Sequence, residues 1–440
     1  MKKIAFLVSL ILIAVTILTP LTASAYEVTD FEVKSEAAML VSLDTGDIMY
    51  QKNVDKQRFP ASLTKIMTAL VVLENVTDID KKITVPEYCI TSLSGTGATM
   101  GNLKAGEELT IRQLLDMTMI ISAADAANTL ADYVGGGSIR SFVDKMNAKA
   151  KELGMDSTKY ANVHGLHNDD HYTTPADMYK LAVYATQQPI LMEICSVSRK
   201  TIDPTNKSDK RILSTTNLLI DPNTKYYYKY AKGIKTGYTS KAGRCLITTA
   251  SKNGYNYLCI IMGAPESDDG SVRQEFIDSE NLYKWAFDDF EYRKIADKNI
   301  TVAEMKLELC WDRDYLQLYP EKEISAIVPE DIDDSTIIYD PVLKSDTVSA
   351  PIKKGDVLGY ARIICAGKEI GQVNLIATEN YDRNILLFAK KVASGICSSP
   401  YFIAFVSALG VLLVIVIIVN IIHNKRKRSG TKRVHHIRKF

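Results

Sequence analysis

The strongest constraint on this chain is an uncharged run from Tyr401 to Ile422, close to the C-terminal end. Within this run only Ser407 and Asn420 are strongly polar. As a helix rising about 1.5 Å per residue, the run extends roughly 33 Å, which is enough to cross a hydrocarbon layer of about 30 Å. We therefore expect a transmembrane helix over residues 400–423.

The two ends of the chain predict which side of the membrane the rest occupies. Lys2 and Lys3 precede an uncharged run and the small-residue site Ala23-Ser24-Ala25, a pattern typical of a secretory signal peptide spanning residues 1–25. An uncleaved N-terminal anchor is the alternative. The tail at 424–440 carries eight lysine and arginine residues, and positive charge beside a span stays cytoplasmic. A single-pass protein with residues 26–399 outside the cytoplasm is predicted.

Composition narrows the classes of partner. The chain has 440 residues, of which 46% are hydrophobic and 24% charged, as in ordinary folded proteins of two or three domains. Without the two basic ends, acidic residues outnumber basic ones by about nine, which argues against a nucleic-acid partner. The seven cysteines lack short paired spacings, so they indicate neither a disulfide framework nor a zinc site. His164, His167 and His171 invite a metal interpretation, but we expect no metal and no cofactor.

The pattern of apolar residues predicts two folded domains. Residues 37–52 resemble two strands around a turn, and helical patterns follow, of which a further one begins near Pro175. Strand-like runs return between 233 and 262 before a last helix near 274–287. This order predicts an α+β domain over 26–290, in which helices flank an antiparallel sheet. Short alternating runs then predict a small all-β domain over 291–383, followed by a linker at 384–399.

A serine and a lysine three residues apart open the helical pattern after Pro60. The run reads Pro60-Ala-Ser-Leu-Thr-Lys-Ile-Met, and proline is favoured in a first helical turn. On a helix Ser62 and Lys65 share one face, so the amine can reach the hydroxyl. A serine needs a neighbouring base to become a nucleophile, and a buried lysine that loses its proton near neutrality can be that base. The same spacing also occurs by chance in helices without catalytic residues, so by itself it is weak evidence.

Two further motifs lie later in the chain. Ser122 stands at the junction of two expected helices, 60 residues after Ser62, and Lys235-Thr236-Gly237 lies in a strand-like run. A lysine and a hydroxyl can hold a carboxylate, while a glycine lets a ligand backbone approach the strand. This order of three motifs is typical of the penicillin-recognising serine enzymes.

Through these three motifs the chain resembles the D-alanyl-D-alanine carboxypeptidases of the low-molecular-mass penicillin-binding proteins. Longer segments carry the resemblance beyond the motifs, namely residues 60–70, 103–110, 162–166, 171–178 and 235–243. The resemblance implies a penicillin-binding or β-lactamase-like fold with a C-terminal β module. It also implies peptidoglycan stem peptides as substrates and β-lactams as acylating inhibitors.

The resemblance implies a role for each motif residue. Ser62 would attack the carbonyl between the two terminal D-alanines, and Lys65 would accept its proton. The backbone N–H groups of Ser62 and Tyr238 would form the oxyanion hole. Ser122 would relay a proton to the leaving amine. The substrate-binding set would be Lys235, Thr236, Gly237 and Tyr238, with Lys235 and Thr236 holding the terminal carboxylate.

One position departs from the family pattern. The second motif of the family is Ser-x-Asn, whereas here Ala124 stands where the asparagine belongs. An alternative is therefore a protein that binds stem peptides or penicillin with little or no turnover. A β-lactamase is less favoured, because the β domain and the anchor suit an enzyme that faces the cell wall.

Overall fold

The structure is a computed structural model that describes residues 31–267, 269–365 and 367–431. The expected signal peptide lies outside these residues. The chain divides into two compact units. The first comprises the chain up to Arg293 together with the later segment Ile327–Ile332. The second comprises Lys294–Ala326 and the chain from Asp333 onward.

The first unit is built on a five-stranded antiparallel sheet in the order β2-β1-β9-β8-β7. Its strands are β1 (Ala37–Ser42), β2 (Ile48–Lys52), β7 (Ala231–Thr239), β8 (Gly243–Lys252) and β9 (Tyr255–Ala264). Strand β1 of the β1–β2 hairpin pairs with β9, which lies more than 200 residues later in the sequence, and Ala37 is opposite Met262 in this pairing. The expected α+β class and antiparallel sheet are confirmed.

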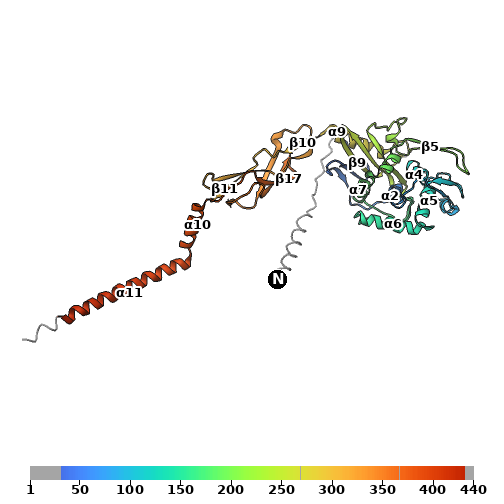
Figure 1. Ribbon diagram of the computed structural model, residues 1–440. Coiled ribbons are helices and arrows are strands. Elements are labelled where there is room, and N and C mark those ends of the chain that lie inside the picture. Colours follow the sequence, from blue (N-terminus) through green and yellow to red (C-terminus); the bar gives the residue numbers. More distant parts are fainter. Residues whose placement is uncertain (1–30, 268, 366, 432–440) are drawn as a thin grey trace, which may run out of the picture. The chain divides into compact units, whose positions relative to one another are not determined.

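Both faces of this sheet are covered, because its strands are apolar on both sides. Along β1, Met39 and Val41 join one hydrophobic core, whereas Ala38 and Leu40 join a second core on the opposite face. Alternate residues of a strand point to opposite faces, so two cores are the direct consequence of an uninterrupted apolar strand. Helix α9 (Gln274–Asp288) covers the second core, as seen beside β9 in Figure 1.

The helices between β2 and β7 cover the first core (Figure 1). They are α2 (Thr64–Asn75), α3 (Glu87–Thr91), α4 (Ile111–Ile120), α5 (Ala124–Val134), α6 (Ile139–Glu152), α7 (Pro175–Thr186) and α8 (Pro189–Cys195). Helix α2 packs against α4, α5, α6 and α7, and every residue from Thr64 to Val72 is buried. A helix that is enclosed on all sides needs no polar face, which explains why most of these positions are apolar. The buried polar residues among them are Thr64, Lys65 and Thr68.

Two short strand pairs extend from this helical layer. Strand β3 (Lys82–Thr84) pairs with β4 (Glu108–Thr110), and β5 (Arg199–Ile202) pairs with β6 (Arg211–Ser214). Two 3₁₀ turns, η1 (Ala61–Leu63) and η2 (Leu218–Ile220), complete the elements of this region. Strand β4 leads directly into α4, where Thr110 and Gln113 form a capping box.

The second unit contains a six-stranded sheet in the order β14-β16-β17-β12-β11-β15. Its strands are β11 (Ala303–Glu308), β12 (Tyr315–Pro320), β14 (Ile337–Leu343), β15 (Thr347–Ser349), β16 (Val357–Cys365) and β17 (Lys368–Ala377). Strands β10 (Phe290–Ala296) and β13 (Ile324–Pro329) pair with each other, and η3 (Asp334–Thr336) precedes β14. The strand content agrees with the expected all-β character of this part of the chain.

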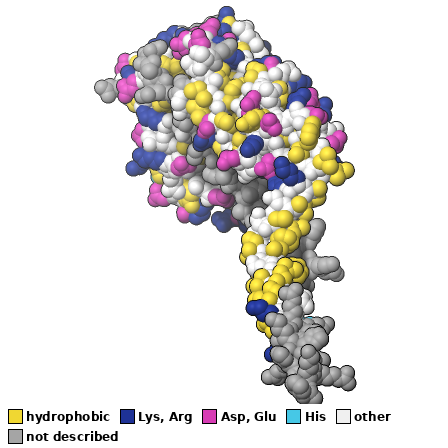
Figure 2. All heavy atoms as spheres, turned by 90° about the vertical axis from the view of Figure 1, so that its left-hand side faces the viewer, with side chains coloured by type: hydrophobic (Ala, Val, Ile, Leu, Met, Phe, Trp, Pro, Cys, Tyr) yellow, Lys and Arg dark blue, Asp and Glu magenta, His cyan; other side chains and the backbone are white. Residues whose placement is uncertain are grey.

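The segment expected to be a linker is helical. Helix α10 (Ile385–Cys397) is capped by Asn384, whose side chain accepts hydrogen bonds from the N–H groups of Leu386 and Leu387. Helix α11 (Pro400–Thr431) comes next. Among the described residues it alone is long and apolar enough to cross a membrane, over Pro400–Arg426 with a mean hydropathy of 3.2. Hydrophobic side chains gather along this part of the chain in Figure 2.

Candidate active site

The centre of the candidate site is a contact between the hydroxyl of Ser62 and the amine of Lys65. Ser62 lies in the 3₁₀ turn η1, and Lys65 lies in the first turn of α2. The Nζ atom of Lys65 is 3.1 Å from Oγ of Ser62 and donates to the carbonyl oxygen of His164 at 2.6 Å. The Lys65 side chain is 2% exposed, so its amine meets these protein atoms in place of bulk water.

The surroundings of Lys65 favour its neutral form. Burial lowers the pKa of Lys65 well below its usual value, and the positive charge of Lys235 lowers it further, while Asp125 acts in the opposite direction. A neutral amine has a free electron pair that can accept the serine proton, which a charged ammonium group cannot do. The structure thus places the Ser62 hydroxyl beside a buried amine whose neutral form is favoured.

The backbone before Ser62 adopts an uncommon conformation. Ala61 has a φ of +47°, in the left-handed region that costs a residue with a side chain some conformational energy. Gly165 packs directly on this turn, since a β-carbon at position 165 would stand 1.9 Å from the carbonyl oxygen of Ala61. Only glycine fits there, so the loop after α6 holds the serine turn in place.

Strand β7 brings the Lys235-Thr236-Gly237 motif against the same turn. A β-carbon at Gly237 would lie 3.0 Å from the backbone nitrogen of Ser62. Lys235 is 1% exposed, and burial lowers its pKa to about 8. The hydroxyls of Thr236 and Thr216 are 2.5 Å apart. The phenol of Tyr238 is exposed and donates a hydrogen bond to Glu266. Only the backbone of Tyr238 therefore continues β7 beside the serine turn.

Ser122 lies in the short turn between α4 and α5, with a φ of +66°. The turn is fixed by its neighbours: the N–H of Ala123 donates to Met117, and the N–H of Ala124 donates to Thr99. No hydrogen bond joins the Ser122 side chain to Ser62 or Lys65 within the described part of the chain. Ala124 is 1% exposed, so the position where the family carries asparagine is enclosed.

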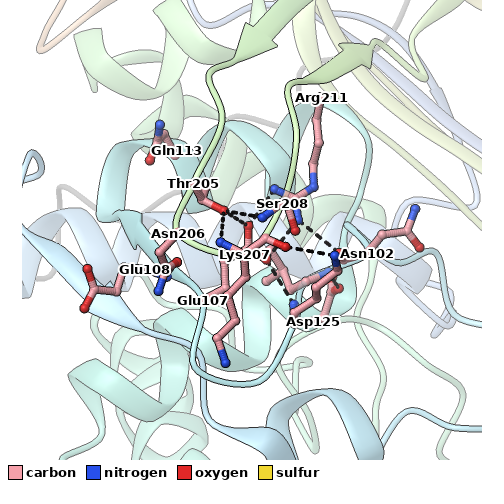
Figure 3. A network of polar contacts seen from close by, with 12 residues as sticks. Asn102, Glu107, Glu108, Gln113, Asp125, Thr205, Asn206, Lys207, Ser208 and Arg211 are labelled. Atoms are coloured by element: carbon pink, nitrogen blue, oxygen red, sulfur yellow. Dashed lines mark hydrogen bonds and ion pairs between the residues drawn. The ribbon is translucent and has the colours of Figure 1, made fainter.

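A buried polar network holds the loop on which this turn rests. Asp125 accepts hydrogen bonds from the N–H groups of Gly101 and Leu103. A few residues on, Glu107 is fully buried and accepts two hydrogen bonds from the Arg211 guanidinium, at 2.8 and 2.9 Å (Figure 3). The guanidinium holds the pKa of the Glu107 carboxyl below its usual range. The β5–β6 hairpin is thereby tied to the segment beside Ser122.

The three closely spaced histidines make contacts within the protein. His164 supplies its carbonyl to Lys65, and His167 lies 3.3 Å from the carboxylate of Asp169. The ring of His171 is buried, with Nε2 2.6 Å from the hydroxyl of Thr64. Over residues 31–267, 269–365 and 367–431, no group of three or more histidine, cysteine or acidic side chains is arranged to hold a metal ion. The contact between Thr64 and His171 could not be predicted from the sequence, because the two residues are 107 positions apart and neither is a defining residue of the three motifs.

Comparison with known proteins identifies the family. Residues 22–266 match the family model described as D-alanyl-D-alanine carboxypeptidase. The chain belongs to this family of serine peptidases. Residues 290–383 of the carboxypeptidase match a second model, described as the C-terminal domain of penicillin-binding protein 5. The expected resemblance is therefore confirmed, and with it the assignment as a hydrolase of the cell wall.

Individual relatives agree with the family match. The D-alanyl-D-alanine carboxypeptidase DacF of Bacillus subtilis is 30% identical over 399 residues, which is 88% of this carboxypeptidase and 97% of the relative. The crystal structure of the Streptomyces K15 DD-transpeptidase covers 59% of the chain and 100% of its own length at 28% identity, with a TM-score of 0.55. The carboxypeptidase DacD of Francisella tularensis covers 84% of the chain and 98% of its own, at 23% identity and a TM-score of 0.63, and supports the fold.

Proposed function

We propose that this carboxypeptidase removes the terminal D-alanine from peptidoglycan stem pentapeptides through an acyl-enzyme on Ser62. The observation that carries the proposal is the 3.1 Å contact between the Ser62 hydroxyl and a buried lysine amine whose other partner is a backbone carbonyl. Because the carbonyl of His164 takes one N–H of that amine, the electron pair of neutral Lys65 can face the serine proton.

In the proposed first step the Ser62 proton passes to Lys65 as Oγ forms a bond to the scissile carbonyl carbon. The N–H groups of Ser62 and Tyr238 receive the developing oxyanion. The carbon–nitrogen bond then breaks, and the proton that Lys65 accepted passes through Ser122 to the leaving D-alanine amine, which returns Lys65 to its neutral form. Water hydrolyses the resulting ester and regenerates the Ser62 hydroxyl.

Substrate binding in this proposal depends on the terminal carboxylate. Lys235 and Thr236 would hold it, and the close approach of Gly237 to Ser62 supports this, because it sets the strand beside the nucleophile. A β-lactam carries both a carboxylate and a strained amide, so it should acylate Ser62 by the same first step, in which the ring opens and no group departs. The lack of a leaving group is a reason to expect a long-lived adduct.

We also propose that the enzyme works outside the cytoplasm, with residues 26–290 as catalytic domain and 291–383 as the β domain. The apolar helix over Pro400–Arg426 supports a single membrane anchor. The proposed signal peptide at 1–25 and basic cytoplasmic tail at 424–440 complete this topology, and they are supported by the charge pattern of the sequence.

The test uses the full chain in detergent micelles with benzylpenicillin and with a synthetic stem pentapeptide. Intact-protein mass spectrometry should show one penicillin adduct, peptide mapping should place it on Ser62, and D-alanine should be released from the pentapeptide. Ser62→Ala should remain folded and lose both signals. An adduct on another residue, or no adduct and no D-alanine release from folded protein, would refute the proposal.

A further inference from the structure

We propose that Thr64 and His171 act as positioning residues that orient the backbone N–H of Ser62 as an oxyanion donor. This inference rests on the proposed function, since it concerns the group that would receive the oxyanion. It assigns a role to two buried residues that are not defining residues of the three motifs: Thr64 stands between Ser62 and Lys65, and His171 lies in a separate segment.

The geometry of one peptide unit links the Ala61 carbonyl to the Ser62 N–H. The carbonyl of Ala61 and the N–H of Ser62 belong to the same planar peptide and point in opposite directions. The Thr64 hydroxyl donates to the Ala61 carbonyl oxygen at 2.8 Å. A hydrogen bond that fixes this carbonyl therefore fixes the direction of the Ser62 N–H.

His171 determines which way the Thr64 hydroxyl points. The Nδ1 atom of His171 accepts a hydrogen bond from the N–H of Ala161 at 3.0 Å, so its proton must be on Nε2. The Nε2–H group then donates to Oγ1 of Thr64 at 2.6 Å, which leaves the threonine proton to donate to Ala61. These three hydrogen bonds run in one direction, and such chains strengthen each of their members.

Bulk water cannot replace this support. Thr64 is fully buried and His171 is 2% exposed, so solvent does not reach either group. Burial lowers the pKa of His171 to about 4, with smaller contributions from His167 and Lys65, so the ring stays neutral. The left-handed conformation of Ala61 is unfavourable by itself and persists only when its surroundings hold it. The hydrogen-bond chain and the packing of Gly165 contribute to that hold, together with the backbone N–H of Thr64, which also donates to the Ala61 carbonyl.

The experiment compares Thr64→Val with Thr64→Ser and with a matched control, Thr118→Val, in the full chain. Thr118 is also fully buried, and its hydroxyl also donates to a backbone carbonyl at 2.8 Å, but on α4, to Leu114. Two quantities are measured: the rate of Ser62 acylation by benzylpenicillin, and the infrared stretching frequency of the acyl-enzyme ester carbonyl. The frequency reports hydrogen bonding from the oxyanion donors, which a general loss of stability does not change.

We expect Thr64→Val to acylate about tenfold more slowly, because removing an oxyanion donor altogether costs about a hundredfold or more and here the donor is only misdirected. Its ester band should move to higher frequency. Thr64→Ser and Thr118→Val should keep the wild-type band and nearly the wild-type rate. If Thr64→Val does not fold, His171→Phe keeps a ring against Tyr160 but loses both nitrogens, and it should shift the band in the same direction.

A wild-type rate and band in Thr64→Val, or in folded His171→Phe, would overturn the inference. Equal slowing in Thr118→Val would also overturn it, because the effect would then be general. A wild-type chain that is not acylated at Ser62 would instead refute the proposed function, so the two failures are distinguishable.

Discussion

Gly237 and Ser62 approach each other so closely that a β-carbon at 237 would stand 3.0 Å from the Ser62 nitrogen. The same atom would lie 3.1 Å from the β-carbon of Ala61 and 3.3 Å from the nitrogen of Leu63. Real β-carbon contacts are rarely so short, so any side chain at 237 must push the serine turn away from β7.

Gly237→Ala should therefore lower the rate of penicillin acylation by about tenfold, because the serine turn must move by a few tenths of an ångström and a displacement near 1 Å at a catalytic group costs about a hundredfold. The protein should still fold, since the neighbouring atoms need to move only slightly. Gly371→Ala is the control, because a β-carbon there meets its neighbours at 3.6 Å or more. Wild-type acylation by Gly237→Ala would show that the close approach has no role in the reaction.

The two buried lysines predict a bell-shaped pH dependence of the second-order rate constant for acylation. Lys65 must be neutral, so the rate constant should fall at acid pH as Lys65 gains a proton. Because the pKa of Lys65 is lowered, this fall should occur at a pH well below the usual pKa of a lysine. Lys235 must be charged to hold a carboxylate, and the lowered pKa of Lys235 means that this charge is lost as the pH rises through about 8.

The methyl ester of benzylpenicillin separates the two limbs, because it lacks the carboxylate. Its profile should keep the acid limb and lose the alkaline one. An alkaline fall shared by the acid and the ester would assign that limb to a group other than Lys235.

Ala124→Asn should restore the polar contact that the family's second motif supplies. A contact of this kind is worth about 1–3 kcal/mol, so pentapeptide turnover should rise by about tenfold. The position is 1% exposed, so the larger side chain should also lower the free energy of unfolding by about 1–3 kcal/mol. D-alanine release and thermal unfolding measure the two effects, and an unchanged rate in a folded variant would mean that another group already fills this role.

Deleting residues 400–440 should release the protein from membranes, because the apolar helix over Pro400–Arg426 supplies the expected membrane affinity. A chain that lacks only residues 424–440 should stay in the membrane fraction after a high-salt wash. If the chain that lacks residues 400–440 also stayed in the membrane fraction, a second attachment would be required, such as an uncleaved N-terminal segment.

Local patterns in the sequence predicted most helices and strands well. The hairpin at 37–52 and the helix α9 were expected within a residue or two of their observed bounds, because apolar periodicity is a property of neighbouring residues. The helix at 385–397 was not expected. Its lysines, serine and glycine interrupt the apolar run, so the pattern does not indicate a helix. Without that pattern, Asn384 cannot be identified as a helix cap from the sequence.

The sequence by itself determined the family, the α+β class and the pairing of Ser62 with Lys65. The pairing depends on a spacing of three residues, whereas the family and the class follow from the order of motifs and of apolar patterns along the chain, which needs no knowledge of contacts. Tertiary structure decided the chemistry of that pair. The proton affinity of Lys65 depends on burial and on the charge of Lys235, 170 residues later, and the turn before Ser62 depends on Gly165 and His171. Spacing along the chain cannot specify these contacts, since they form only when β7 and the loop after α6 pack on one turn.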